Sequence, residues 1–222
     1  MATMKRDVGD KAFPIWLLGD SNPKNWQTIL KYPFDPRHPV RHNIWTSITD
    51  VVQRRVFNQL NTLIRTESIY IRNAVAEPNL KANASSVEWA RQLLEEISTF
   101  HELVVRHKPK VLITFGSFAY EFARRTFNED PSHKYSYWGA NKLGEEFMKS
   151  VSEFTLSKTN VFPLLHRSIS GGKYIQSHEY FCKAPGANYF DIVGAKIAQI
   201  IIDNRNSFDI WVRDPSNLYL SE

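Results

Sequence analysis

The chain has 222 residues, of which 42% are hydrophobic and 23% are charged, as is typical of one globular domain. We expect a single domain over residues 1–222, without a signal peptide and without a membrane span, because no apolar run approaches the roughly 18 residues that a span needs. One cysteine, Cys182, excludes an internal disulfide and a cluster held by several thiolates. The 28 Lys and Arg against 23 Asp and Glu favour a polyanionic partner such as nucleic acid, in the cytosol.

Four apolar runs with β-branched or aromatic residues predict strands over residues 12–18, 68–75, 110–115 and 161–165. Between and after them, apolar residues at helical spacing predict amphipathic helices over residues 44–64, 87–105, 117–127, 141–154 and 189–202. The alternation predicts an α/β fold with three αβα layers around a central four-stranded, mainly parallel sheet. Ligands of such sheets bind outside the carboxyl ends of the strands.

Three connecting segments carry further expectations. The long loop over residues 22–42 is rich in proline and aromatic residues, so we expect it to fold over the site. Glu77, Pro78 and Asn79 predict a turn, and residues 129–139 predict an exposed loop. The stretch 206–222 contains Trp211 and Tyr219, which predicts that it packs back on the body.

We expect polar side chains to follow the ends of three predicted strands. They belong to Asn22, Asn73 and His166, and a parallel sheet would bring them to one edge. An asparagine can orient a water or read two edges of a base, and a histidine can donate to an oxygen that gains negative charge. Each residue also has an ordinary interpretation, as a turn, a strand-end cap or a buried histidine.

Together these segments resemble the uracil-DNA glycosylase superfamily. Its first motif, an apolar strand, Gly, and Asp or Asn before Pro, is similar to residues 19–23, and its uracil-reading asparagine lies on a strand similar to residues 70–75. Its Lys-Pro-Lys-Val, Gly-Ser-x-Ala and His-Pro-Ser segments are similar to residues 108–111, 116–119 and 166–168. The likeness covers about residues 13–202, and residues 33–35 and 43–45 are most similar to the mismatch-specific thymine/uracil branch.

The resemblance implies a role for each site residue. Catalysis falls to Asn22 and His166, and Asn73 binds the base. Phe34 stacks on the extruded base, with Trp26 or Tyr32 as substitutes. The loop over residues 166–176 then grips DNA, with Ile169 or Tyr174 as a wedge between bases. The DNA-binding set is Ser117, Arg167, Ser168, Ile169, Ser170 and Lys173, with the backbone of Gly171 and Gly172.

The chain departs from the family pattern at three positions. One extra residue lies between Gly19 and Asn22, which makes Asp20 a rival for activating the water. The residue after Pro23 controls the room near C5 of the base, and here it is Lys24, which suggests a target with a polar group at C5. Arg167 replaces the proline of His-Pro-Ser, which adds a cation to the proposed clamp.

The resemblance implies a DNA glycosylase that releases a flipped pyrimidine, uracil or a C5-modified one, and leaves an abasic site. We expect it to act as a monomer on DNA in the cytoplasm, at the nucleoid, with no metal or organic cofactor. One alternative is a glycosylase for hydroxymethylated or glucosylated cytosine in phage DNA, acting in anti-phage defence. Others are an inactive homologue that binds DNA or a base, and a metal hydrolase using His178 and Cys182, which are four residues apart.

Overall fold

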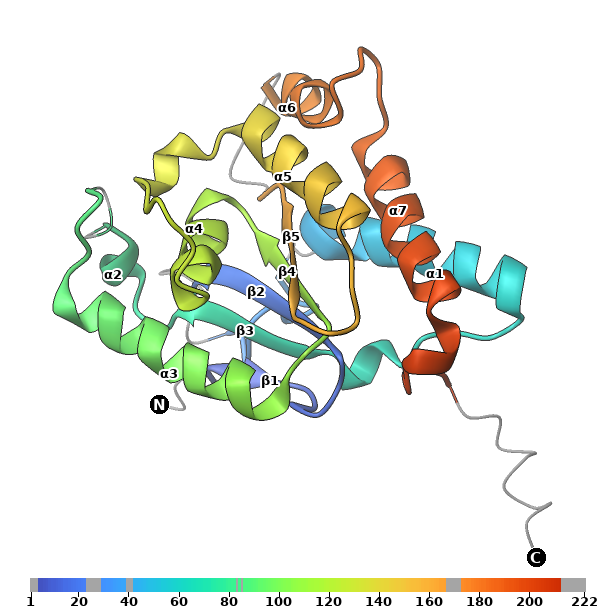
Figure 1. Cartoon of the computed structure of the whole chain (residues 1–222), viewed down its shortest axis with the longest axis horizontal. Coiled ribbons are helices and arrows are strands. Elements are labelled where there is room, and N and C mark those ends of the chain that lie inside the picture. The colour runs from blue at the N-terminus through green and yellow to red at the C-terminus, as the bar shows by residue number, and fades with distance from the viewer. Residues whose placement is uncertain are drawn as a thin grey trace, which may run out of the picture.

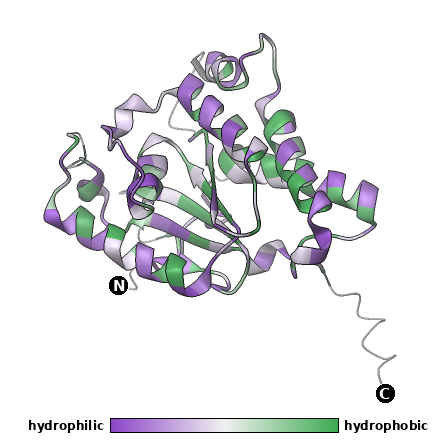
Figure 2. Cartoon of the chain, in the orientation of Figure 1, coloured by the Kyte–Doolittle hydropathy of each residue, from purple (hydrophilic) through white to green (hydrophobic). Residues whose placement is uncertain are grey.

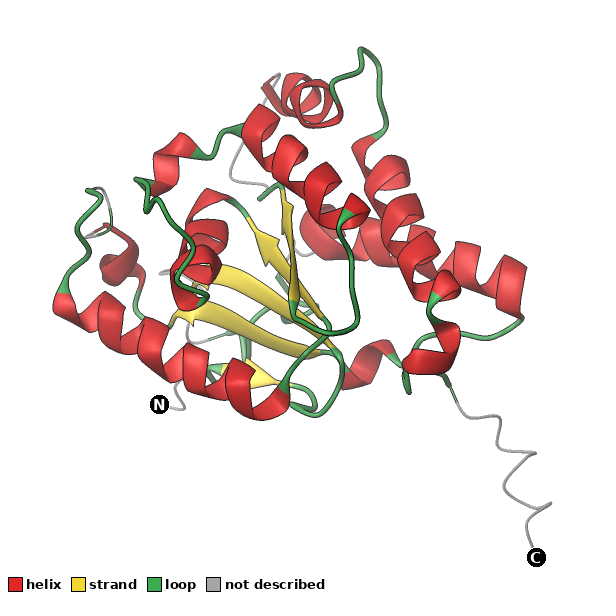
Figure 3. Ribbon diagram, viewed as in Figure 1, coloured by secondary structure: helices red, strands yellow, loops and turns green. Residues whose placement is uncertain are grey.

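The computed structural model describes residues 4–22, 29–38, 42–82, 84, 86–166 and 173–212, and of residues 42, 43, 173 and 174 it describes the backbone alone. The fold is α/β, a mixed five-stranded sheet with helices on both faces (Figures 1 and 3). The strands are β1 (Asp7–Val8), β2 (Ile15–Ser21), β3 (Tyr70–Val75), β4 (Val111–Phe115) and β5 (Asn160–Leu164). The described α-helices are α1 (Ser47–Leu60), α2 (Pro78–Ala82), α3 (Arg91–His107), α4 (Ser117–Thr126), α5 (Ala140–Ser152), α6 (Lys173–Cys182) and α7 (Tyr189–Asp203).

The sheet has the strand order β1-β3-β2-β4-β5. The four strands β3, β2, β4 and β5 run parallel, as the sequence predicts. The prediction of four strands was wrong by one, because β1 pairs with β3 in the antiparallel sense, Asp7 opposite Arg72. A two-residue strand has no alternation of apolar and polar residues that a sequence pattern can reveal.

Two layers of helices cover the sheet because its strands are apolar on both faces. On β2, Ile15 and Leu17 belong to one buried cluster, whereas Trp16 and Leu18 belong to another. The first cluster includes side chains of α1, α5, α6 and α7, and the second includes side chains of α3 and α4. Helices α1 and α7 pack on each other (Figure 1), and the helices carry hydrophilic and hydrophobic residues in alternation (Figure 2).

Several helices begin or end at residues other than those that the sequence predicts. The expected helix over residues 44–64 is a π-helical turn (His42–Thr46) followed by α1, which ends because Asn61 takes the left-handed conformation, with φ of 50°. The expected turn at residues 77–79 begins α2 instead, and Pro78 is its first residue. Helix α3 begins at Arg91, after the N-cap residue Ala90, and so starts four residues later than the predicted residue 87.

The segment over residues 129–139 is not simply an exposed loop. Trp138 is buried there, and its indole N–H donates to Glu121 of α4 over 2.7 Å. None of the helices in the described ranges is both long and apolar enough to cross a membrane. The C-terminal stretch packs back as far as the structure describes it, because Phe208 and Ile210 are buried and Trp211 forms a bridge with Ile64.

Candidate functional site

The candidate site lies at the edge of the sheet where the four parallel strands end. The register pairs Gly19 with Asn73 and Ser21 with Val75, so β2 and β3 end side by side. Phe115 pairs with Leu164 at the ends of β4 and β5. Asn73 lies within β3 and Asp20 within β2, so the expectation that Asn73 follows the end of its strand was wrong, although both residues stay close to this edge.

Asn22 and Asn73 are in direct contact. The side-chain N–H of Asn73 donates to the Oδ1 of Asn22 over 2.7 Å, and both residues are only 5% exposed. An amide nitrogen carries two hydrogens and an amide oxygen two acceptor sites, so this bond uses part of what each side chain offers. Within the part of the chain that the structure describes, no hydrogen bond to the Oδ1 of Asn73 is found. The pair therefore keeps donors and acceptors for a ligand.

Phe34 lies against the same pair because Gly19 leaves room for both. A Cβ on Gly19 would stand 2.3 Å from the Oδ1 of Asn73 and 2.9 Å from the Cε2 of Phe34. The Phe34 ring packs on Phe115 at the end of β4, with centroids 5.1 Å apart. Phe34 has a φ of 56°, an uncommon conformation for a bulky residue. The structure thus brings the expected stacking residue to the asparagine that would read the base.

Asp35 holds the segment that carries Phe34. Its buried carboxylate accepts hydrogen bonds from the backbone N–H of Lys31 (2.9 Å) and of Arg37 (3.0 Å), and from the Arg37 guanidinium (2.9 and 2.5 Å). These bonds, those to Arg37 above all, hold the pKa of Asp35 well below its usual range. The part of the long loop that is described, residues 29–38, is therefore ordered over the sheet edge.

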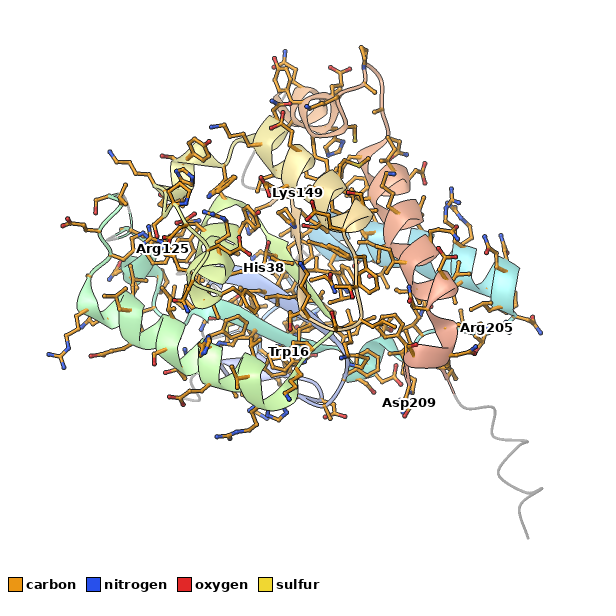
Figure 4. The ribbon with its side chains drawn as sticks, viewed as in Figure 1. Trp16, His38, Arg125, Lys149, Arg205 and Asp209 are labelled. Carbon is orange, nitrogen blue, oxygen red and sulfur yellow. The ribbon has the colours of Figure 1, made fainter. Side chains whose placement is uncertain are left out.

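His38 is a candidate site residue that sequence reasoning missed. Its backbone N–H donates to the carbonyl of Asp35 over 2.9 Å, and Figure 4 labels its side chain near the centre of the view. Burial and then the neighbouring His166 lower the pKa of His38, so the two imidazoles lie close enough to interact. The sequence offered no signal for it, since His38 belongs to a loop without a motif.

His166 follows β5 and stands over Gly116. The backbone N–H of Leu165 donates to the hydroxyl of Tyr189 on α7 over 3.0 Å, which fixes the chain just before His166. A Cβ on Gly116 would come within 2.6 Å of the Cβ of His166, and Gly116 has a φ of 90°, so only glycine fits there. Burial lowers the pKa of His166 against the opposing effect of Asp20, which favours a neutral imidazole near pH 7.

Asp20 lies beside His166 and is held from two sides. Its Oδ1 accepts from the backbone N–H of Ala119 in the first turn of α4 over 3.2 Å, where the N-cap residue Gly116 has no side chain to do so. Its Oδ2 forms an ion pair with Lys81 of α2. Sequence reasoning missed Lys81 because it expected a turn there, although a lysine three residues after Pro78, just beyond a strand, could have drawn notice.

Ser117 begins α4 at the same edge. Its hydroxyl donates to the carbonyl of Trp138 over 2.5 Å, which ties α4 to the segment before α5, so its expected contact with DNA stays a prediction. Lys173 is the first residue of α6, and its side chain is not described. The other predicted contacts, Lys24, Arg167, Ser168, Ile169 and Ser170, lie outside the described residues.

His178 and Cys182, named for the metal alternative, do not belong to a metal-binding cluster among the described residues. His178 stacks on Tyr189 with ring centroids 4.9 Å apart, and Cys182 packs against the larger buried cluster. Burial lowers the pKa of His178 and raises that of Cys182. Over the described ranges, no three His, Cys, Asp or Glu side chains come together in a way that could hold a metal ion.

The chemistry of this edge is that of a site for a small polar ring. Amide donors and acceptors, an aromatic face, a neutral imidazole and a paired carboxylate lie within one cluster, and they come from segments up to 146 residues apart, as from Asp20 to His166. A scan against family models found no matching family, and a search of curated proteins found no similar protein. The assignment of function therefore depends on the geometry of these residues.

Proposed function

We propose that the protein is a DNA glycosylase that hydrolyses the N-glycosidic bond of a flipped-out pyrimidine, uracil or a C5-modified one, and leaves an abasic site. The observation that carries the proposal is the contact between Asn22 and Asn73, with Phe34 packed on the same glycine and His166 at the same edge. The motif residues of the resemblance thus meet in space. The helices on both faces of a largely parallel sheet support assigning a uracil-DNA glycosylase-like fold.

Extrusion of the base comes first, since a duplex hides its glycosidic bond. Unstacking costs a few kcal/mol, which binding must offset. Phe34 offers its face to the extruded ring, and the amide of Asn73 offers a donor and an acceptor to two adjacent positions on its edge. Asn73 is buried, so a base that fails to pair with the amide leaves polar groups unsatisfied, and this discriminates among bases.

Bond cleavage leaves negative charge on the departing base. A neutral His166 can donate one ring N–H to the base oxygen as that charge grows, and burial favours the neutral form. One donor of this kind is worth about 3 kcal/mol in the transition state. His38, near His166, is a candidate for orienting its ring.

A water molecule then attacks the sugar carbon. The contacts of Asp20 with Lys81 and with the N–H of Ala119 take one acceptor site on each of its oxygens and hold its charge between two partners. Asn22 accepts only one hydrogen bond from Asn73 in the described structure, so it retains capacity to orient a water. These contacts favour Asn22 over Asp20 as the residue that positions the water.

The rest of the proposal concerns DNA and its target. Phosphate contacts fall to Ser117 and to the predicted clamp, and the net charge of +5 supports a polyanionic partner. The enzyme would act as a cytoplasmic monomer without a cofactor. Lys24 favours a polar substituent at C5, which keeps hydroxymethylated or glucosylated cytosine of phage DNA as an alternative target. The amide of Asn22, where other members have a carboxylate, keeps the inactive homologue as a second alternative.

The test is a panel of duplexes that each carry one altered pyrimidine, followed by alkali cleavage. We expect strand breaks at uracil or at a C5-modified pyrimidine, and none in the unmodified duplex. Release of uracil but not of modified cytosine would dispose of the decorated-base alternative. Binding without any cleavage across the panel would contradict the glycosylase and favour the inactive homologue.

A further inference from the structure

Lys81 brings an amine to the candidate site. Helix α2 begins at Pro78, three residues after the end of β3, so it lies at the edge where the parallel strands end. The Lys81 ammonium forms an ion pair with the Oδ2 of Asp20, and its side chain is 31% exposed. The amine is therefore both held in place and open to a ligand.

The carboxylate that holds Lys81 is next to His166. The Oδ1 of Asp20 and the Cβ of His166 both lie close to the position that a Cβ on Gly116 would occupy, at 3.7 and 2.6 Å. The charges of Asp20 and Lys81 both affect the His166 ring. The amine, the carboxylate and the imidazole thus form one group at the same sheet edge as Asn73.

Three other described lysines bond to groups outside this cluster. Lys11 pairs with Asp7, Lys110 donates to the carbonyl of Leu156, and Lys183 pairs with Glu145. If the only role were to neutralise the charge of Asp20, an arginine would serve equally well, because its guanidinium keeps its proton in proteins. A lysine in this position can in addition lose a proton and attack a carbonyl carbon.

We infer that Lys81 is a nucleophile that forms an imine with the C1′ aldehyde of the abasic sugar, which gives the same site a DNA strand-cleaving lyase activity. The inference rests on the proposed function, since the abasic sugar is the product of base excision. It adds a second reaction to that function, after hydrolysis by water has released the base.

The steps balance without any further reactant. The Lys81 ammonium gives a proton to the Asp20 carboxylate, and its Nζ lone pair forms a bond to C1′ of the open-chain sugar. The C1′ oxygen takes the second Nζ proton and the proton from Asp20 and leaves as water, which produces a protonated imine. Asp20 then removes a proton from C2′, the C3′–O bond breaks, and the phosphate-terminated strand departs. Water hydrolyses the remaining imine and frees Lys81.

The experiment uses a duplex with an abasic site already in place, together with sodium borohydride, which reduces an imine to a stable amine. We expect a covalent adduct of the full chain with DNA, and digestion followed by mass spectrometry should find the sugar remnant on Lys81. Lys81→Arg, which keeps the charge beside Asp20, should lower the adduct yield at least tenfold. Lys183→Arg, at an exposed ion pair with Glu145, is the matched control and should leave the yield unchanged.

An adduct on a different lysine, no adduct at all, or an undiminished yield in folded Lys81→Arg would overturn the inference. Mapping the adduct in the wild-type chain gives an answer even if the variant fails to fold. The duplex needs no base excision, so the result is independent of the pyrimidine panel. Base release without an adduct would overturn the lyase and leave the glycosylase standing, whereas an adduct without base release would do the reverse.

Discussion

Two buried polar clusters border the same helix, α4, one along its middle and last turn and the other at its first turn, and they differ in how many of their polar groups the described contacts use. In the first cluster, the completely buried Glu121 accepts hydrogen bonds from four donor groups. These are the Arg124 and Arg125 guanidinium groups at 3.3 and 2.8 Å, the backbone N–H of His133 at 2.8 Å and the indole of Trp138 at 2.7 Å. The Arg125 guanidinium also stacks over Trp89, 4.1 Å from the ring centroid.

In the second cluster, at the start of α4, the contacts among the described residues use fewer of the polar groups. Asn22 and Asn73 share one hydrogen bond, and Asp20 is divided between Lys81 and the helix N-terminus. A buried charge that neighbouring side chains satisfy completely holds structure and has nothing left to bind. The difference teaches that burial of polar groups does not mark a site by itself, whereas bonding capacity left over at a sheet edge does.

Breaking the Glu121 cluster should have the largest effect, and it should fall on stability. Glu121→Gln removes the buried carboxylate that Arg124 and Arg125 share, which costs about 3–5 kcal/mol. For a chain of this size that lowers Tm by about 6–20 °C, measured by thermal unfolding. Glu129→Gln is the control, because Glu129 also pairs with Arg124 but is 47% exposed, so the cost should stay within about 1 kcal/mol. Equal losses in the two variants would contradict the structural role.

Removing a side chain from the second cluster should reduce turnover and spare the fold. His166→Ala and Asn22→Ala should each lower kcat about 10²–10³-fold, or about 3–4 kcal/mol, while DNA affinity changes far less. Single-turnover base release and DNA binding measure the two effects. His133→Ala is the control, because this histidine stacks on Tyr137 outside the cluster. Wild-type turnover in both site variants would overturn the assignment of roles.

The parts of this comparison that the sequence predicted are the local ones. Strand ends at Asn22 and His166 could be placed because each follows an apolar run, and parallel strands end at one edge. The same pattern located Asn73 on its strand, although not its position within it. Helices α4, α5 and α7 were close to their observed bounds because their apolar residues repeat with helical spacing.

What the sequence could not predict depends on contacts between distant segments. From the sequence, Glu121 looks like a surface residue of an amphipathic helix. The sequence does not show that Trp138 packs over it and donates a hydrogen bond to it. Lys81 and His38 join the site through packing against β2 and His166, and no local pattern reports such a contact. The strand β1 exists only because Asp7 meets Arg72 across 65 positions.

Crowding the amide of Asn73 tests whether its position matters without removing it. Gly19→Ala places a Cβ 2.3 Å from the Asn73 Oδ1, so the amide or Phe34 must move. Overpacking of this kind costs about 1–3 kcal/mol, and we expect kcat/KM to fall by about 10–100-fold on the preferred duplex. Gly139→Ala is the matched control, since nothing lies within 4 Å of its added Cβ. An unchanged kcat/KM in Gly19→Ala would show that Asn73 does not contact the base.

Acidification should affect the stability of the protein and the rate of base release separately. Burial lowers the pKa of His166 and of His178, so between those lowered values and about 6.5 the unfolded chain binds more protons than the folded one. Stability from both residues is fully present above that pH and is lost as the pH falls below it. The rate of base release should hold to a lower pH and decline only as the pH falls through the lowered pKa of His166, because the folded protein gains that proton there.

Two variants separate these contributions, with unfolding and base release followed across pH. His178→Gln should weaken the acid loss of stability but leave the pH profile of base release unchanged, because His178 stacks on Tyr189 and is not among the side chains proposed to act on the base. His166→Gln should weaken the acid loss of stability and flatten the residual rate profile. A rate profile that shifts in His178→Gln but not in His166→Gln would show that the rate depends on the titration of His178 and not of His166.

The smallest effect should come from the predicted clamp. Lys173 begins α6 after the segment that resembles the family's DNA-gripping loop, and a lysine that neutralises one phosphate contributes about 0.9 to the slope of log affinity against log salt concentration. Lys173→Ala should lower that slope by about this amount and weaken binding similarly for every duplex sequence, with kcat unchanged. Lys158→Ala is the control, because Lys158 precedes β5 and so lies at the opposite edge of the sheet. If Lys158→Ala lowered the slope as much as Lys173→Ala, DNA would not bind at the edge where Asn22, Asn73 and His166 meet. Unused bonding capacity in the second cluster would then not indicate a DNA-binding site.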